Sequence, residues 1–116
     1  MNAVRKLALI GLVGGSVPAF ATQGSAINAE VTGVDVRVGG IFLVAFTPAP
    51  STPPICATAT DSRMTGNSTT ADGKALLAAA LTAYATGAPI ALIQGNGACT
   101  EYPNHEFLAI LSQGVE

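Results

Sequence analysis

The side chains best suited to chemistry in this sequence gather in one segment near the carboxyl end. Six polar or aromatic residues there are candidates for contacting a ligand: Gln94, Asn96, Glu101, Tyr102, Asn104 and His105. Amide and carboxylate groups match pairs of sugar hydroxyls, and an aromatic ring can cover the apolar face of a pyranose. Loops carried on a rigid scaffold often hold binding sites, although the same residue types are common in any loop. We predict a carbohydrate-binding loop over residues 94 to 106.

Catalysis is less well supported by the residue pattern. A nucleophile needs an oriented base within hydrogen-bond reach, and His105 is the only histidine. The sequence contains no Gly-x-Ser-x-Gly, no P-loop and no His-Glu-x-x-His motif, which are the patterns of common catalytic and phosphate-binding sites. Asp61, Asp72, Glu101 and Glu106 are isolated acids of the kind that solvate loops or cap helices. We therefore predict a protein that is not an enzyme, with no catalytic residues, no cofactor and no metal.

Cys56 and Cys99 are the only cysteines, and an even number in a small exported protein indicates a disulfide. A redox pair or a metal site would be the alternatives. However, there is no Cys-x-x-Cys motif, and one histidine is too few for a usual zinc site. A bridge would close a loop of about forty residues and stabilise the fold by roughly 3 to 4 kcal/mol.

Residues 1 to 21 have the pattern of a secretory signal peptide. Arg5 and Lys6 precede an apolar run, and Ala19-Phe20-Ala21 fits the small-residue cleavage site. We expect cleavage near Ala21 and a secreted or periplasmic protein without a membrane span. The signal holds two of the five basic residues and none of the seven acidic ones, so the remainder has a net charge of −4. This charge argues against a nucleic-acid partner, since phosphate binding needs clustered Lys and Arg.

Hydrophobic patterning predicts the elements that would position the loop. Residues 30 to 38 alternate like a half-buried strand, and Gly39-Gly40 links them to a second strand over 41 to 46. Further strands are expected over 55 to 60, 89 to 94 and 106 to 113, with a helix over 73 to 86 that Asp72 caps and Gly87 ends. Residues 22 to 29 are expected to be a flexible leader, and residues 30 to 116 one domain. The order β-β-β-α-β-β predicts a mainly β fold with one helix, like the OB-fold Greek-key barrel.

The stretch from residue 75 to residue 100 contains no charged side chain. A surface helix normally has one charged face, so the predicted helix is expected to contact protein on both sides, its own sheet on one and sister chains on the other. An Ala-rich sequence is also simply a good helix former. Four residues are the candidates for an oligomer interface: Leu76, Ala79, Ala80 and Ala83.

Two parts of the sequence resemble a known family. The segment ALTAYATGAPIALI, followed by the Tyr-Pro of TEYPNHEFLAIL, is similar to the helix, strand and loop of the subtilase-cytotoxin and pertussis-like toxin B subunits. The Val-Thr-Gly-Val stretch at residues 31 to 34 resembles their first-strand Ser-Gly-Val motif. The similarity covers residues 30 to 38 and 71 to 111, and its most specific part is the junction at residues 84 to 90.

The resemblance implies an OB-fold B subunit that forms a homopentamer, binds a cell-surface glycan and accompanies a separate catalytic A subunit. It places Thr32 where those proteins have a sugar-contacting serine. Where they have an aromatic residue after the fourth strand, this sequence has Gln94 or its neighbour Ile93. The alternative function, from another class, is an exported structural or inhibitory protein that makes only protein contacts.

Overall fold

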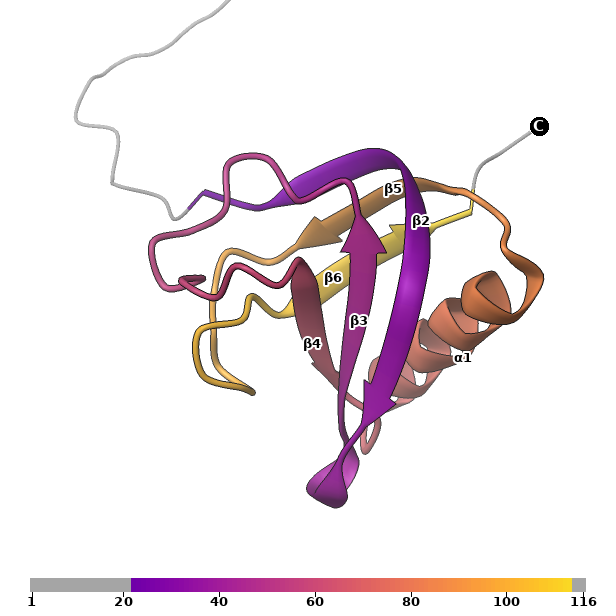
Figure 1. Cartoon of the computed structure of the whole chain (residues 1–116). Coiled ribbons are helices and arrows are strands. Elements are labelled where there is room, and N and C mark those ends of the chain that lie inside the picture. Colours follow the sequence, from indigo (N-terminus) through magenta and orange to yellow (C-terminus); the bar gives the residue numbers. More distant parts are fainter. Residues whose placement is uncertain (1–21, 114–116) are drawn as a thin grey trace, which may run out of the picture.

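A computed structural model describes residues 22 to 113 (Figure 1). The predicted signal peptide, residues 1 to 21, lies outside the described residues. The structure is mainly β, with one helix between the third and fourth strands, as predicted. The elements in chain order are β2 (Ser25–Val36), a 3-10 turn η1 (Val38–Gly40), β3 (Ile41–Thr47), β4 (Arg63–Asn67), α1 (Ala71–Thr86), β5 (Ile90–Gly95) and β6 (Leu108–Ser112). No helix in this described part is long and apolar enough to cross a membrane.

The five strands form one antiparallel sheet in the order β4-β3-β2-β5-β6. The long, curved β2 pairs with β5 through its first half and with β3 through its second half, with an irregularity between Val31 and Gly33. A parallel bridge between Thr65 and Phe107 brings the two ends of the sheet together. The backbone N–H of Thr65 donates to the carbonyl of Glu106 at 2.9 Å. This connectivity and closure are those of a small OB-fold-like barrel.

The core lies inside this barrel. Alternate residues of β3 point inward, and β2, β4, β5, β6 and α1 add further apolar side chains. The largest fully buried members of this core are Phe42, Phe46, Met64, Ile90, Ile93, Leu108 and Val44. The helix packs against β2, β4 and β6, and it approaches through its small residues Ala80 and Ala83. The part of the helix that lacks charged side chains, from residue 75 onward, therefore has one face on its own barrel, as predicted.

The helix begins earlier than predicted. Thr70, not Asp72, is the N-cap, and its hydroxyl accepts a hydrogen bond from the backbone N–H of Gly73 at 2.9 Å. Asp72 instead lies in the first turn, where its charge suits the helix dipole. The prediction for the other end is confirmed. Gly87 takes the left-handed conformation, with φ 71°, and its N–H donates to the carbonyl of Ala83.

Two other predictions were wrong. Residues 25 to 29, expected to be part of a flexible leader, form the first half of β2, because Ser25 pairs with Gln94 and Ala29 with Ile90. Residues 55 to 60, expected to be the third strand, lie instead in the long β3–β4 connection, and the third strand is β4. The backbone N–H of Ala57 donates to a carbonyl within this connection rather than to a sheet.

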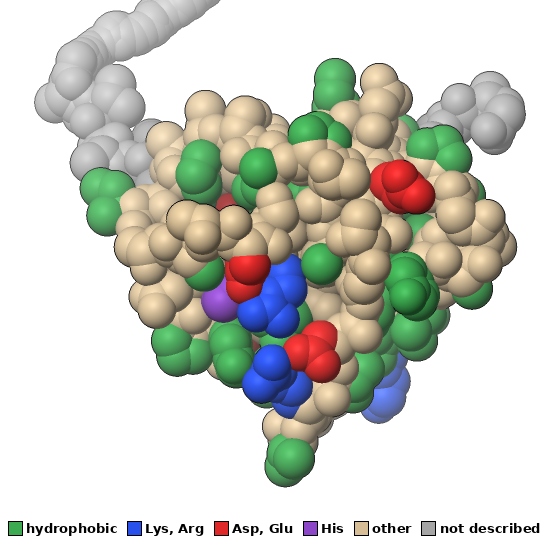
Figure 2. Space-filling model, viewed as in Figure 1, with side chains coloured by type: hydrophobic (Ala, Val, Ile, Leu, Met, Phe, Trp, Pro, Cys, Tyr) green, Lys and Arg blue, Asp and Glu red, His purple; other side chains and the backbone are tan. Residues whose placement is uncertain are grey.

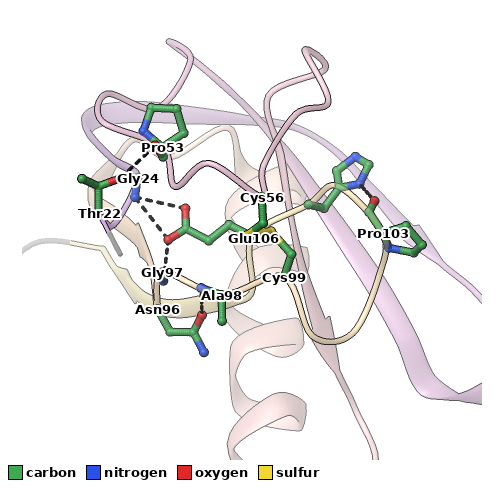
Figure 3. Close-up of a disulfide and its surroundings, with 11 residues drawn as sticks. Thr22, Gly24, Pro53, Cys56, Asn96, Gly97, Ala98, Cys99, Pro103 and Glu106 are labelled. Atoms are coloured by element: carbon green, nitrogen blue, oxygen red, sulfur yellow. Dashed lines mark hydrogen bonds between the residues drawn. A yellow bond between two sulfur atoms is a disulfide. The ribbon is translucent and has the colours of Figure 1, made fainter. Parts of the chain in front are cut away.

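The predicted disulfide is present. Cys56 and Cys99 are bonded, with their Cα atoms 6.0 Å apart. The bridge joins the β3–β4 connection to the loop between β5 and β6, which we call the 96–107 loop (Figure 3). The loop that carries most of the candidate binding residues is therefore covalently fixed to a second part of the chain.

Candidate functional site

Four charged side chains collect beside the outer face of β2, β3 and β4. Asp35 and Arg37 stand two residues apart at the end of β2, and Asp61 and Arg63 stand two apart at the start of β4. The spacing of two places Asp35 and Arg37 on the same side of an extended chain. The backbone between Asp61 and Arg63 is not extended, because Ser62 has a positive φ of 54°. The strand register brings the two pairs close together. Asp35 lies opposite Leu43 of β3, and Arg63 lies opposite Ala45, two residues further along β3. We call these four residues the ionic face.

Ion pairs hold the ionic face together. Arg37 contacts the Asp35 carboxylate at 2.8 Å. Arg63 contacts Asp61 at 2.7 Å and lies 3.6 Å from Asp35. Figure 2 shows the blue and red side chains gathered on this face, with the histidine beside them, on a surface otherwise mostly uncharged. Because each arginine is paired with a carboxylate, the site offers hydrogen-bond donors and acceptors in a fixed arrangement rather than a net positive charge.

His105 joins the ionic face from the 96–107 loop. Its side chain is 8% exposed, and Nε2 lies 2.9 Å from Oδ2 of Asp61. Its other ring nitrogen, Nδ1, lies 2.8 Å from the carbonyl oxygen of Pro103. Since both partners only accept hydrogen bonds, both bonds form together only when each ring nitrogen carries a proton. Burial acts to raise the pKa of Asp61, but hydrogen bonds and charge from His105 and Arg63 outweigh it and lower that pKa from its ordinary 3.8.

Tyr102 links the loop to β2. Its ring centroid lies 5.4 Å from that of His105, with the planes tilted by 59°. The guanidinium carbon of Arg37 lies 5.3 Å from the same ring centroid, which is within range of a cation–π contact. Nearby, the Asn67 side-chain amide donates to Glu101 at 3.1 Å. An aromatic ring, two arginines, a histidine and two carboxylates thus lie within one connected set of contacts.

The candidate residues of the loop are only partly brought together. Glu101, Tyr102 and His105 contact the ionic face or its strands. Asn104 lies next to His105 and is exposed, and its carbonyl accepts from the N–H of Ala59. Asn96 is exposed, and its side-chain oxygen accepts from the backbone N–H of Ala98 at 2.9 Å, so one of its groups has a local structural role.

Two further candidates lie elsewhere on the barrel. Thr32 is exposed on β2 at the irregularity between Val31 and Gly33. Gln94 lies on β5, where its amide donates to the side chain of Gln23 at 3.0 Å. None of the hydrogen bonds and ion pairs described for residues 22 to 113 joins Thr32 or Gln94 to the ionic face.

The residues of the ionic face were not among our sequence candidates. The sequence does contain a pattern that could have indicated them, because Asp-x-Arg occurs twice, at residues 35 to 37 and 61 to 63. Each motif alone is only an exposed ion pair. Their meeting depends on β3, which lies between β2 and β4.

The predicted oligomer interface needs correction. Ala80 and Ala83 are buried in the core of their own domain, so they have no surface left for a second chain. Leu76 and Ala79 are half-buried. The large hydrophobic side chains that α1 exposes are instead Leu81, at 45%, and Tyr84, at 54%.

Within residues 22 to 113, no group of three or more His, Cys, Asp or Glu side chains is arranged to hold a metal ion. No protein-family model matches the chain, and neither a curated protein nor a solved structure gives a significant match. The class that the connectivity defines is a small OB-fold-like barrel, and the evidence for function comes from the surface just described.

Proposed function

We propose that this protein is a secreted, non-catalytic carbohydrate-binding subunit that works as a homopentameric ring. The observation that carries the proposal is the contact between the ionic face and Tyr102. OB-folds bind oligosaccharides and oligonucleotides on the face of their second and third strands, next to the loop between the fourth and fifth. In this chain those elements are β3, β4 and the 96–107 loop, and the ionic face lies beside them.

The chemistry of this surface suits a sugar better than a nucleic acid. Guanidinium and carboxylate groups held in fixed pairs match neighbouring hydroxyls as donors and acceptors. Tyr102 supplies an aromatic ring for the apolar side of a pyranose. Nucleic-acid binding needs unpaired positive charge, whereas Arg37 and Arg63 both contact carboxylates.

The assembly part of the proposal rests on the outer side of α1. Leu81 and Tyr84 stand exposed on a helix whose outer surface is otherwise small and uncharged from residue 75 onward. A sister chain could cover these side chains, and closed cyclic symmetry is common among soluble homo-oligomers. The resemblance to toxin B subunits implies a ring of five chains and a separate catalytic A subunit as a partner.

The two tyrosines of the chain allow the two roles to be tested separately. Tyr102→Ala should weaken binding on a glycan array by about 10-fold or more, because it removes the aromatic platform, and should leave the oligomeric mass unchanged. Tyr84→Ala should retain glycan recognition but lower the mass found by size exclusion with light scattering. Full glycan binding by the Tyr102 variant would contradict the proposed site. A wild-type protein that is a monomer at micromolar concentration would remove the ring.

The alternative function is an exported structural or inhibitory protein that makes only protein contacts. Two exposed apolar side chains favour it, since Val38 at the β2–β3 turn is 97% exposed and Ile55 is 96% exposed. Such side chains are suited to insertion into a partner protein. A filament or a tight complex with a protease, lost in Val38→Ser and accompanied by no glycan binding, would favour this alternative.

A further inference from the structure

A cavity of about 270 Å³ opens between the β3–β4 connection and the segment that precedes β6. Its apolar lining is made mainly of small side chains: Ala49, Pro50, Pro53, Ala57 and Ala59. Met64 and Glu106 also line it and are almost completely buried. The cavity is larger than the roughly 150 Å³ that accommodates benzene and close to the lower end of the range for ligand sites.

Glu106 is the unusual member of this lining because it is a carboxylate that is only 2% exposed. Its donors are two backbone groups (Figure 3): the N–H of Gly24 lies 3.0 Å from Oε1 and 3.2 Å from Oε2, and the N–H of Gly97 lies 2.7 Å from Oε2. Among the described residues, no Lys, Arg or His side chain forms an ion pair with it. A carboxylate has about four acceptor positions, and Oε1 here receives only the donor that it shares with Oε2.

The backbone around this carboxylate is built to approach it closely. A Cβ atom at Gly24 would lie 2.7 Å from Oε1 of Glu106, and one at Gly95 would overlap the same carboxylate. Burying a carboxylate without a cation is unfavourable, and burial accordingly raises the pKa of Glu106. The glycines keep the charged group in place, and the cavity borders it with apolar walls.

We propose that this cavity binds a small organic cation, a protonated amine on a compact apolar body, whose ammonium group donates to Oε1 of Glu106. The apolar body would pack on the proline and alanine walls. Arg63 also lines the cavity, but its charge is compensated because its guanidinium lies 2.7 Å from Asp61. The cavity and the glycan site share Arg63 and Asn104 at their border, but Glu106 is not part of the glycan site, and the proposal does not depend on glycan binding.

The test compares two probes of nearly equal shape, benzylammonium and benzyl alcohol, titrated into the mature protein at pH 7.5 and followed by NMR. Benzylammonium should give saturable shifts at the amides of Gly24 and Gly97, and benzyl alcohol should bind at least about 10-fold more weakly, since it lacks the charge-assisted hydrogen bond. Equal affinity for the two probes would overturn the proposal. So would the absence of saturable shifts with benzylammonium.

Variants locate the site. Glu106→Gln should weaken benzylammonium binding by about 10-fold to 100-fold. Ala59→Leu should block the cavity without touching the carboxylate, whereas Thr58→Leu adds bulk at the neighbouring exposed residue and should bind normally. If Glu106→Gln does not fold, the comparison of Ala59→Leu with Thr58→Leu tests the site. Equal benzylammonium binding by these two variants would refute it. A glycan array with Ala59→Leu should match the wild type, which separates this test from that of the glycan site.

The pH dependence gives an independent readout. Benzylammonium affinity should fall as the pH drops through the raised pKa of Glu106, because the protonated carboxyl no longer attracts the cation. The groups facing this side chain are the Gly24 and Gly97 amides, with Arg63, itself paired with Asp61, elsewhere in the lining. Binding that does not change between pH 8 and pH 4 would contradict a role for the charge.

Discussion

Removing the disulfide gives the most quantitative test of how this small barrel is stabilised. The change is the double substitution Cys56→Ser/Cys99→Ser, which leaves two small polar side chains in place of the bridge. Both cysteine residues lie in connections rather than in strands, so the sheet itself loses no residue. The main effect should be on the unfolded chain, which gains the freedom that the bridge removes.

The expected size follows from the sequence separation of 43 residues between the bonded cysteines. A closed loop of that length lowers the entropy of the unfolded chain by an amount equivalent to about 4 kcal/mol at 25 °C. Domains of this size have a free energy of unfolding of about 5 to 15 kcal/mol. Loss of the bridge should therefore remove a large fraction of the stability and lower the melting temperature by roughly 15 to 30 °C.

Urea unfolding followed by circular dichroism measures this difference. The oxidised wild type, the wild type reduced with dithiothreitol and the double variant should be compared in parallel. The reduced protein and the variant should agree with each other, because both lack only the bridge. A loss below about 1 kcal/mol in both would refute the reasoning and mean that the 96–107 loop is held by its noncovalent contacts alone.

Four further substitutions test the helix start and the buried carboxylate. Gly73→Ala should destabilise by about 3 kcal/mol in urea unfolding, because the new Cβ would overlap the carbonyl of Asn67; an unchanged midpoint would contradict this. Thr70→Ala should cost about 1 kcal/mol in the same assay and Asp72→Ala less, since the threonine hydroxyl is the cap, and the reverse order would contradict the assignment. Burial raises the pKa of Glu106 above its ordinary 4.5, so its contribution to stability is fullest below pH 4.5 and is lost as the pH rises through the folded pKa. Glu106→Gln should flatten that part of a plot of unfolding free energy against pH, and a slope equal to that of the wild type would count against it.

The sequence predicted the elements whose pattern is local. The helix has its Gly87 terminator, and the Gly39-Gly40 turn lies between apolar runs, so both could be placed from neighbouring residues. By contrast, β4 has the sequence RMTGN, which has little strand preference. It forms a strand because Gly66 leaves room for the ring of Phe42, which would lie 2.3 Å from a Cβ at that position. The contact between Gly66 and Phe42 cannot be recognised from the sequence of β4 alone.

In the candidate site, too, some residues could be predicted from their neighbours in the sequence and others could not. Tyr102 and His105 could be selected from the composition of their loop. The ionic face could not, since Asp35 and Arg63 come near each other only through the register of β3 between β2 and β4. Likewise, Ala80 and Ala83 were predicted to be interface residues because the helix around them carries no charge, and the structure buries both side chains inside their own domain instead.

The pairing of β2 with both β3 and β5 has a consequence for when the protein can fold. Ser25 pairs with Gln94, about 70 residues later in the chain, so the barrel lacks a central pairing until β5 has been synthesised. Contacts of such long sequence separation form late and slow the folding of small domains. Growing chains that stop short of β5 should therefore remain accessible to proteases and chaperones, and folding should occur only after β5 has been synthesised.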